Sequence, residues 1–322
     1  MTRREFSLAA AAAPASAAQP SKIRIAFLGM SHSHAEGKLA VVNANPAFEL
    51  AGIWDSQGKG QTRSKTDILR DKSVQAIACE GFVWENAELA LEALEAGKHV
   101  HLEKPPSETL VQFKKIQSIA SRKKLLVQLG YMWRYNPAIN EAFRLAKSGM
   151  LGDLYAVRAQ MNTIANAEQR KAWGRFRGGD MFEQGSHLVD MLVRLMGKPT
   201  RVTSILQTHA QPGDGFKDNT MAALEWPRVI GTIHAATLQP NATAHRFLEI
   251  LGTKGTAYVR PLEPPVLITD IGGKPARTEY KYQRYVDDFV ELADCIASGK
   301  PLSVTPEQDL WATEALLAAC GQ

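Results

Sequence analysis

The sequence predicts an α/β domain, in which strands and helices alternate, followed by an α+β domain that is rich in strands. Three observations support this fold class. The apolar run 23–28 ends at Gly29 and leads into a helical pattern near His34, the order of strand, turn and helix in a dinucleotide-binding domain. Strand-like and helical patterns then alternate up to residue 130. Six further strand-like segments, separated by turn residues, follow between residues 154 and 260.

Length and composition exclude several classes of protein. With 322 residues, of which 45% are hydrophobic, the chain can bury the cores of two domains. A net charge of +5 is too small to indicate a basic nucleic-acid-binding face. The three cysteines, Cys79, Cys295 and Cys320, have no metal-ligand spacing and no evident disulfide framework. We expect them to be small buried side chains and expect no nucleic-acid partner.

The N-terminus is typical of an export signal. Residues 2–8, Thr-Arg-Arg-Glu-Phe-Ser-Leu, match a twin-arginine motif, and Ala15-Ser16-Ala17 is a candidate cleavage site. The intervening alanine run is too short and too weakly apolar to span a bilayer. We therefore expect a signal peptide over residues 1–18, export to the periplasm by the twin-arginine route and no membrane partner. The alternative is a cytosolic N-terminus with a chance pair of arginines.

The turn after the first strand carries a degraded glycine fingerprint. Counting G-x-G-x-x-G from Gly29 places Ser31 and His34 at the second and third glycine positions. Ser31 is small enough for a backbone to approach a pyrophosphate, whereas His34 would loosen the packing of helix on strand. His32 and His34 could instead bind a metal, but the sequence offers no third ligand nearby. We interpret them as polar side chains at a helix start and predict no metal site.

Asp55 closes the second apolar segment, 48–54, and its carboxylate could accept hydrogen bonds from an adenosine ribose. A carboxylate at this place would repel a 2′-phosphate, so NAD is favoured over NADP. The alternative is an aspartate that only caps the strand. Residues 56–66 are too few for a crossover helix and another strand before the next segment, 67–70. We therefore expect this domain to lack one helix and one strand.

The remaining elements of the first domain lead to a candidate catalytic lysine. The predicted elements are a strand over 74–80, a helix over 86–97, a strand over 99–102, a helix capped by Ser107 and running to Lys123, and a strand over 125–130. Lys104 follows the third of these, next to Glu103. A lysine at the carboxyl end of a strand in an α/β sheet points into the ligand crevice, where it can exchange a proton with a substrate hydroxyl. The alternative is a solvated loop.

The block Ala96 to Pro105, with the pattern AlaGlyLysHisVal-x-x-GluLysPro, resembles the signature of the Gfo/Idh/MocA family, named for glucose–fructose oxidoreductase, inositol dehydrogenase and a rhizopine catabolism protein. Its members are nicotinamide-dependent sugar and polyol oxidoreductases, and the resemblance runs from Lys22 to the C-terminus. It implies a Rossmann domain over 22–130, an open, largely antiparallel sheet domain over 131–283 and helices over 284–322 that pack back on the Rossmann domain. Assembly into a homo-oligomer through the sheet domain is also implied.

The resemblance assigns residues to an NAD(P) site. The residues expected to bind the cofactor are Gly29, Ser31, His32, Asp55, Glu103 and Lys104. One departure is the Cys79-Glu80-Gly81 segment, which stands where the family usually has a Thr-Pro pair. Contact of that segment with the nicotinamide ribose is therefore left open.

A glycine-rich turn at 178–179 enters a helix that carries Glu183, His187 and Asp190 on one face. The family pattern here is Asp-x-x-x-His, in which the aspartate binds substrate and the histidine is the proton partner of the substrate hydroxyl. Glu183 takes the aspartate position, so the extra methylene shifts its carboxylate. Two alternatives remain: a buried His187 paired with Asp190, and a metal site of Glu183 and His187 for which no third ligand is identifiable.

Arg134 and Tyr135 follow the last predicted strand of the first domain. In the family this segment crosses between the domains, and its arginine and tyrosine can line the substrate site. Such side chains suit a hydroxylated ring, which has apolar faces and hydrogen-bonding edges. They are equally common as packing residues between domains, so both interpretations stay open.

The predicted function is an NAD(P)-dependent oxidoreductase that acts on a small carbohydrate, namely a sugar, polyol or glycoside. Lys104 and His187 would form its catalytic acid–base pair, and Glu183, Asp190, Arg134 and Tyr135 would bind substrate. Two alternatives use the same motifs. One is an NAD-dependent enzyme that cleaves glycosides by transient oxidation at C3, and the other is a sugar-binding protein that has the fold without turnover.

Overall fold

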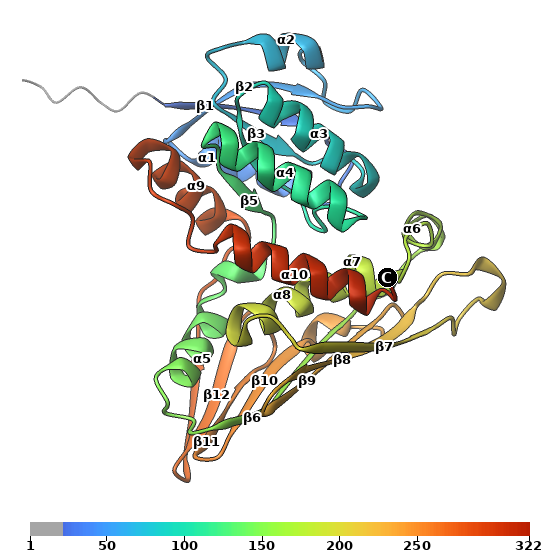
Figure 1. The fold of residues 1–322 in the computed structure, drawn as a ribbon, viewed down its shortest axis with the longest axis vertical. Coiled ribbons are helices and arrows are strands. Elements are labelled where there is room, and N and C mark those ends of the chain that lie inside the picture. The colour runs from blue at the N-terminus through green and yellow to red at the C-terminus, as the bar shows by residue number, and fades with distance from the viewer. Residues whose placement is uncertain (1–21) are drawn as a thin grey trace, which may run out of the picture.

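The computed structural model describes residues 22–322, so the predicted signal peptide lies outside the described part of the chain. Two sheets of different construction dominate the fold, and helices lie between them (Figure 1). Within the described part, no helix is long and apolar enough to cross a membrane.

The N-terminal sheet has five parallel strands in the order β2-β1-β3-β4-β5. These strands are β1 (Ile23–Leu28), β2 (Phe48–Trp54), β3 (Ala76–Cys79), β4 (His99–Leu102) and β5 (Val127–Leu129). They are almost entirely buried, as expected for a parallel sheet covered on both faces. The carboxyl ends of β1, β3 and β4 lie side by side, which brings the turn at Gly29, the Glu80 segment and Glu103 to one edge of the sheet.

The prediction that one strand is missing is confirmed. After β2 the chain makes only a short helix, α2 (Lys65–Arg70), and returns as β3 on the other side of β1. Compared with the Rossmann order 3-2-1-4-5-6, the strand outside β2 is absent, so β2 is an edge strand. The prediction that one helix is missing is confirmed too, because residues 56–64 form no helix and the six-residue α2, capped by the Ser64 side chain, is the 67–70 segment expected before the next strand.

Three longer helices cover the N-terminal sheet: α1 (Ala35–Ala44), α3 (Val83–Glu95) and α4 (Leu110–Lys123). Two predicted boundaries were wrong. The α3 helix starts before Asn86, directly after the loop that follows β3. The cap of α4 is Thr109, whose hydroxyl accepts the Gln112 N–H at 3.3 Å, whereas the Ser107 hydroxyl donates to the Thr109 carbonyl. Either hydroxyl satisfies the capping pattern, so composition alone did not separate them.

The second sheet has eight strands in the order β13-β12-β11-β10-β6-β9-β8-β7. Its strands are β6 (Leu154–Asn162), β7 (Arg201–Gln207), β8 (Asn219–Trp226), β9 (Val229–Ala236), β10 (Phe247–Gly252), β11 (Gly255–Val259), β12 (Val266–Ile271) and β13 (Lys274–Glu279). The β6–β9 pair is parallel and the other pairs are antiparallel. The hairpin β12–β13 was not predicted, because every residue of β13 is exposed and no alternation of apolar residues marks it.

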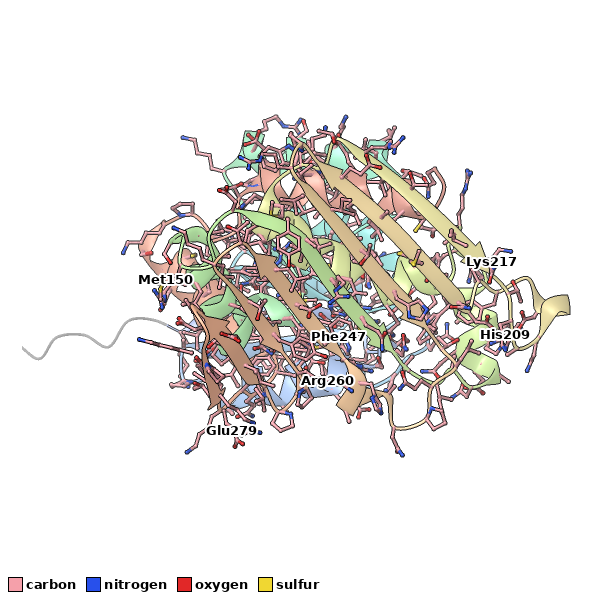
Figure 2. All side chains as sticks on the ribbon, turned by 90° about the horizontal axis from the view of Figure 1, so that it is seen from below. Met150, His209, Lys217, Phe247, Arg260 and Glu279 are labelled. Carbon is pink, nitrogen blue, oxygen red and sulfur yellow. The ribbon has the colours of Figure 1, made fainter. Side chains whose placement is uncertain are left out.

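Helices cover one face of the second sheet (Figure 1). The remaining helices are α5 (Pro137–Lys147), α6 (Ala167–Trp173), α7 (Asp180–Glu183), α8 (Gly185–Met196), α9 (Val286–Ser298) and α10 (Pro306–Ala319), with short 3-10 helices η1 (Met132–Tyr135), η2 (Pro212–Asp214) and η3 (Ala242–His245). The opposite face is open (Figure 2). The strand register places four exposed apolar side chains on it: Ile205, Met221, Ile230 and Ile268. Assembly of a homo-oligomer through this face stays a prediction.

The two C-terminal helices return to the N-terminal domain. Phe289 of α9 packs its ring against Phe48 and His101, with centroids 5.9 and 4.8 Å apart. The Arg134 guanidinium, from η1, donates to Asp309 of α10 and to Asp190 of α8. The interdomain region is therefore held by aromatic packing and by a buried ion cluster.

Asp288, in the first turn of α9, is fully buried, and neither of its carboxylate oxygens has a hydrogen-bond partner within residues 22–322. Burial raises the pKa of this carboxyl from its ordinary 3.8 to about 7. A raised pKa in the folded state favours folding at low pH, and this contribution is lost as the pH rises from about 4 through about 7.

Asp288→Asn is therefore expected to weaken the pH dependence of stability. Between pH 5 and pH 8, the unfolding free energy of the wild type should fall by on the order of 2 kcal/mol more than that of the variant, because the amide never ionises. Urea unfolding at the two pH values measures this difference. Asp294→Asn, on the exposed side of the same helix, is the control. Equal pH dependence of wild type and Asp288→Asn would contradict the expectation.

Candidate active site

The candidate site begins at the turn after β1. Gly29 has a φ of +101°, and a Cβ on it would lie 2.0 Å from the Gly81 backbone nitrogen. Only glycine fits this contact, which joins the β1–α1 turn to the loop after β3. The first glycine of the degraded fingerprint therefore has the role of shaping the crevice where such sheets bind ligands.

Asp55 lies at the carboxyl end of β2 and faces the same turn. Its Oδ2 accepts the Met30 N–H at 2.7 Å and the Ser31 hydroxyl at 3.0 Å, and its Oδ1 accepts the N–H groups of Gln57 and Lys59. Burial opposes ionisation, but these donors outweigh it and lower the pKa of the carboxyl. A carboxylate has about four lone-pair sites, so a ribose hydroxyl would have to displace one of these donors.

A charged cluster is buried below the turn. The Lys38 ammonium, on α1, donates to Glu80 Oε1 at 2.6 Å and to Glu103 Oε2, and all three side chains are fully buried. Burial raises the pKa of Glu80 to about 7 although Lys38 opposes the shift. The pKa of Glu103 is well below its usual range, because Lys38 and the two histidines His32 and His34 outweigh its desolvation.

The two histidines of the turn lie between this cluster and the second domain. His34 Nδ1 is 3.2 Å from Glu103 Oε1, and burial lowers the pKa of His34 to about 4, so its imidazole is neutral. His32 has a carboxylate on either side: Glu103 Oε2 is 3.9 Å from its Nδ1, and Glu183 Oε1 is 3.9 Å from its Nε2. His32 therefore connects the carboxyl end of β4 with α7 of the second domain.

Lys104 is buried, with 1% of its surface exposed, and its ammonium donates to Glu183 Oε1 at 2.5 Å and to the Glu183 carbonyl at 3.2 Å. Burial opposes ionisation of Glu183, but Lys104 overrides it and the pKa of Glu183 falls to about 2. The lysine and glutamate that the sequence assigned to catalysis and to substrate binding thus form one ion pair between the two domains.

His187 follows on α8 and is also buried. Its ring lies between Tyr131 and Trp133, with centroids 5.7 and 5.1 Å away, and its Nδ1 has no hydrogen-bond partner in the described structure. Burial, and then the nearby Lys104 ammonium, hold the pKa of His187 well below its usual range. Asp190 does not pair with this histidine, so the predicted alternative of a His187–Asp190 pair does not describe the structure.

The other predicted substrate residues lie in the interdomain packing. Asp190 accepts hydrogen bonds from Arg134 at 2.6 and 3.2 Å, and the Tyr135 hydroxyl donates to Glu291 at 2.5 Å. Burial raises the pKa of Asp309, the second partner of Arg134, to about 6. The packing interpretation of Arg134 and Tyr135 accounts for these contacts, and neither residue lines the cleft described next.

A cleft of about 240 Å³ opens beside His32 and Glu183. Aromatic side chains and carboxylates line it: Ser31, His32, Ser33, Phe82, Val83, Trp84, Glu168, Gln169, Ala172, Trp173, Phe176 and Glu183. The Phe82 and Trp84 rings are stacked, with centroids 4.5 Å apart, and the Arg175 guanidinium lies 4.0 Å over Trp84. The cleft therefore offers flat apolar faces next to the Lys104–Glu183 pair.

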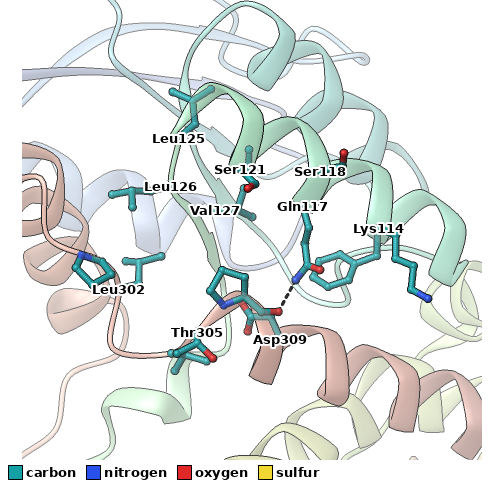
Figure 3. A pocket seen from close by; sticks show the side chains of 15 residues that line it. Lys114, Gln117, Ser118, Ser121, Leu125, Leu126, Val127, Leu302, Thr305 and Asp309 are labelled. Carbon is teal, nitrogen blue, oxygen red and sulfur yellow. Dashed lines mark hydrogen bonds between the residues drawn. The ribbon is translucent and has the colours of Figure 1, made fainter.

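A second cavity, of about 580 Å³, lies between α4 and the segment that leads into α10 (Figure 3). Its lining is mostly apolar and includes Leu125, Val127 and Leu302. None of the histidines, lysines or carboxylates of the charged cluster lines it. The smaller cleft is the better candidate for the active site, because it borders His32 and Glu183, which adjoin the charged cluster and Lys104, whereas the titratable groups that line the larger cavity are Lys114 and Asp309.

Sequence reasoning missed two parts of this site. Lys38 was not predicted to belong to the site. It lies three residues after Ala35 and four before Val42, which places all three on the buried face of α1. Asp180 was not singled out either, and it is fully buried with both carboxylate oxygens unpartnered within residues 22–322. A charged residue at an apolar-face position was the available signal for Lys38. No signal in the sequence identified Asp180.

The fold and the site define a two-domain oxidoreductase with an NAD-binding Rossmann domain. Residues 23–131 match the oxidoreductase family with an NAD-binding Rossmann fold, and residues 139–258 match the Gfo/Idh/MocA C-terminal domain. The chain belongs to the Gfo/Idh/MocA family of oxidoreductases.

Several characterised and uncharacterised proteins are similar to the chain. It is 27% identical over 210 residues to the uncharacterized oxidoreductase YhhX of Escherichia coli, covering 61% of each chain. It is 24% identical over 231 residues to the scyllo-inositol 2-dehydrogenase (NADP(+)) IolW of Bacillus subtilis, covering 68% of this chain and 63% of the relative. The chain thus matches about three fifths of the length of each. The aldose-aldose oxidoreductase of Caulobacter crescentus shares the fold, with a TM-score of 0.80 and 19% identity over 94% of this chain and 98% of that one.

NAD(P) is the cofactor that this family of domains binds, and the residues around the β1 turn fit it. The contact of Gly29 with Gly81 shapes the crevice, and α1 presents its N-terminus there. Asp55 stands at the ribose position of the fold. A ribose hydroxyl would have to replace one of its present donors, such as the Met30 N–H or the Ser31 hydroxyl. Glu103 and Lys104 follow β4, at the edge of the sheet where such folds bind their ligands.

Proposed function

We propose that this protein transfers a hydride between NAD(P) and a hydroxyl-bearing carbon of a sugar, polyol or glycoside. One observation supports the proposal above the others. Lys104, buried at the carboxyl end of β4, is paired with Glu183 from the other domain beside an aromatic cleft. A buried lysine whose charged partner lines a cleft is a candidate for catalysis on physical grounds.

The side chains of the chain would handle the proton while the bound nicotinamide supplies or accepts the hydride. The neutral His187 imidazole has an unpartnered Nδ1 and could accept the proton of a substrate hydroxyl. The Lys104 ammonium would stabilise the charge that develops on the same oxygen. Glu183 would hold this ammonium in place, which makes it a positioning residue as well as a candidate for substrate binding.

The cleft supports an uncharged, ring-shaped substrate. Phe82, Trp84 and Trp173 provide apolar faces, and Glu168 and Glu183 provide hydrogen-bond acceptors. No lysine or arginine is among the lining residues of the described structure, and the nearby cations are already engaged, Arg175 over the Trp84 ring and Lys104 with Glu183. A levoglucosan dehydrogenase and a scyllo-inositol 2-dehydrogenase are among the similar proteins, and both are named for substrates with hydroxylated rings.

The proposal predicts that the protein binds a nicotinamide dinucleotide. Nucleotide released by denaturing the purified protein should be identified by mass spectrometry, and NAD and NADP should be titrated onto the protein. Gly29→Ala should abolish binding, because the new Cβ would collide with Gly81 and force the crevice apart.

The matched control is Gly97→Ala. Gly97 also has a positive φ, of +78°, but a Cβ there meets nothing within 4 Å, so this variant should bind nucleotide like the wild type. Circular dichroism would confirm that both variants are folded. The proposal would be wrong if the wild type released no nucleotide and bound neither NAD nor NADP. That result would favour the carbohydrate-binding alternative.

A further inference from the structure

The structure brings a third potential metal ligand to the His32–His34 pair. Glu103 is 69 residues from His34 in the sequence, yet its Oε1 is 3.2 Å from His34 Nδ1. One nitrogen from each histidine and one oxygen of Glu103 all lie within 4.8 Å of one another. Ligand atoms this close can share one ion at bond lengths of about 2.0–2.2 Å after small side-chain movements.

The carboxylate of this group is already held by an outer shell. Lys38 donates to Glu103 Oε2, which leaves Oε1 on the side of His34. Glu80 in turn fixes the Lys38 ammonium at 2.6 Å. Carboxylates that bind metals are themselves hydrogen-bonded in this way, and the outer partner fixes their orientation.

The two imidazoles can also direct a ring nitrogen at a shared metal ion. His34 directs its Nδ1 toward the shared space, 3.2 Å from Glu103 Oε1. His32 Nδ1 accepts the His34 backbone N–H at 3.2 Å, and this contact between residues two apart would be given up on coordination. The ring of Tyr285 lies beside His34 at a centroid distance of 5.5 Å, and on the other side of the group His32 lines the cleft.

A buried carboxylate oxygen without a partner faces the same region. Glu183 Oε2 accepts no hydrogen bond within residues 22–322, and the side chain is 4% exposed and lines the cleft with His32. Buried polar atoms are normally paired, so an unpaired one next to potential ligands indicates a missing partner. A water molecule on a metal ion would supply that partner.

We propose that His32, His34 and Glu103 bind one divalent transition-metal ion, with an open position directed at the cleft. Two imidazoles and one carboxylate are a ligand set of zinc sites that keep a position free for water or substrate. The imidazoles disfavour magnesium and calcium, which prefer oxygen ligands. Hydride transfer to nicotinamide needs no metal, so this site goes beyond the function proposed above and does not depend on it.

The test is metal binding by the full-length protein. Protein stripped with a chelator should be dialysed against zinc at neutral pH, and bound zinc should be measured by plasma mass spectrometry. The wild type should bind one zinc per chain, and His34→Ala should lose at least a hundredfold in affinity. Cobalt(II) is a second probe, because its visible absorption should report imidazole coordination in the wild type and disappear in His34→Ala.

Two further variants separate ligand loss from misfolding. His209→Ala changes an exposed histidine outside the site and should bind zinc like the wild type. Glu103→Gln keeps the side-chain shape and should also lose zinc, with folding of every variant checked by circular dichroism. Absence of stoichiometric zinc binding by the wild type, or equal affinity of wild type and His34→Ala, would overturn the proposal. Nucleotide binding should be measured on the same samples. A protein that binds nucleotide but no zinc would contradict the metal site alone and leave the proposed oxidoreductase function standing.

Discussion

Lys104→Ala is expected to lower turnover by roughly 10²–10⁴-fold while leaving nucleotide binding nearly intact, the usual effect of removing a positioned acid–base or charge-stabilising group. The side chain is buried and its ammonium contacts only Glu183 in the described hydrogen bonds, so under the proposed function its loss would remove a charge beside the substrate hydroxyl. Steady-state kinetics on a substrate found by screening aldoses, polyols and glycosides would measure kcat, and nucleotide titration would measure binding.

Companion variants show whether the residues act together. His187→Ala should lower turnover to a similar degree, and the double variant should be much less impaired than the product of the two single effects. Glu183→Gln should weaken substrate binding more than it slows chemistry. Lys114→Ala, an exposed lysine on α4, is the control for loss of a positive charge. Normal turnover in Lys104→Ala would show that the catalytic assignment of this lysine is wrong.

Lys38→Met is expected to lower the free energy of unfolding by about 3–5 kcal/mol, because it leaves two buried carboxylates without their cation. Glu80 and Glu103 are fully buried, and Lys38 is the ammonium that both accept hydrogen bonds from. Methionine has a similar length, so loss of packing volume contributes little. Urea unfolding at neutral pH measures the change.

Two comparisons make this expectation specific. Adding Glu80→Gln and Glu103→Gln to Lys38→Met should recover much of the lost stability, because no unpaired charge then remains buried. Lys65→Met breaks the partly exposed Lys65–Glu92 pair and should cost less than about 1 kcal/mol. A loss for Lys38→Met no larger than that for Lys65→Met would show that the buried cluster is not stabilised by its ion pairs.

Local features of the sequence predicted much of the N-terminal domain. The apolar run before Gly29 predicted β1, and the short interval 56–66 predicted the missing strand, because a crossover needs a minimum length of chain. The strand His99–Leu102 has the predicted bounds. The β12–β13 hairpin was missed because β13 buries no side chain and has no periodic pattern to detect.

The candidate site was only partly predictable, because its contacts join residues far apart in the chain. Lys104 and His187 were found through motifs, whereas the pairing of Lys104 with Glu183 spans 79 residues. The same holds for Lys38 with Glu103, 65 residues apart, and for Arg134 with Asp309, 175 residues apart. The sequence shows which residues can ionise or transfer a proton. Their charge state depends on a neighbouring partner that only the folded structure identifies.

The Lys104–Glu183 pair also opposes separation of the two domains, since each domain contributes one of its members. A hinge motion that separates the domains must pull a buried ammonium from a buried carboxylate and solvate both, which places an activation barrier on opening. Closing restores the pair and expels water from the same place. If Lys104 takes part in the proposed chemical step, the same lysine would also control the rate at which the crevice exchanges its contents with solvent.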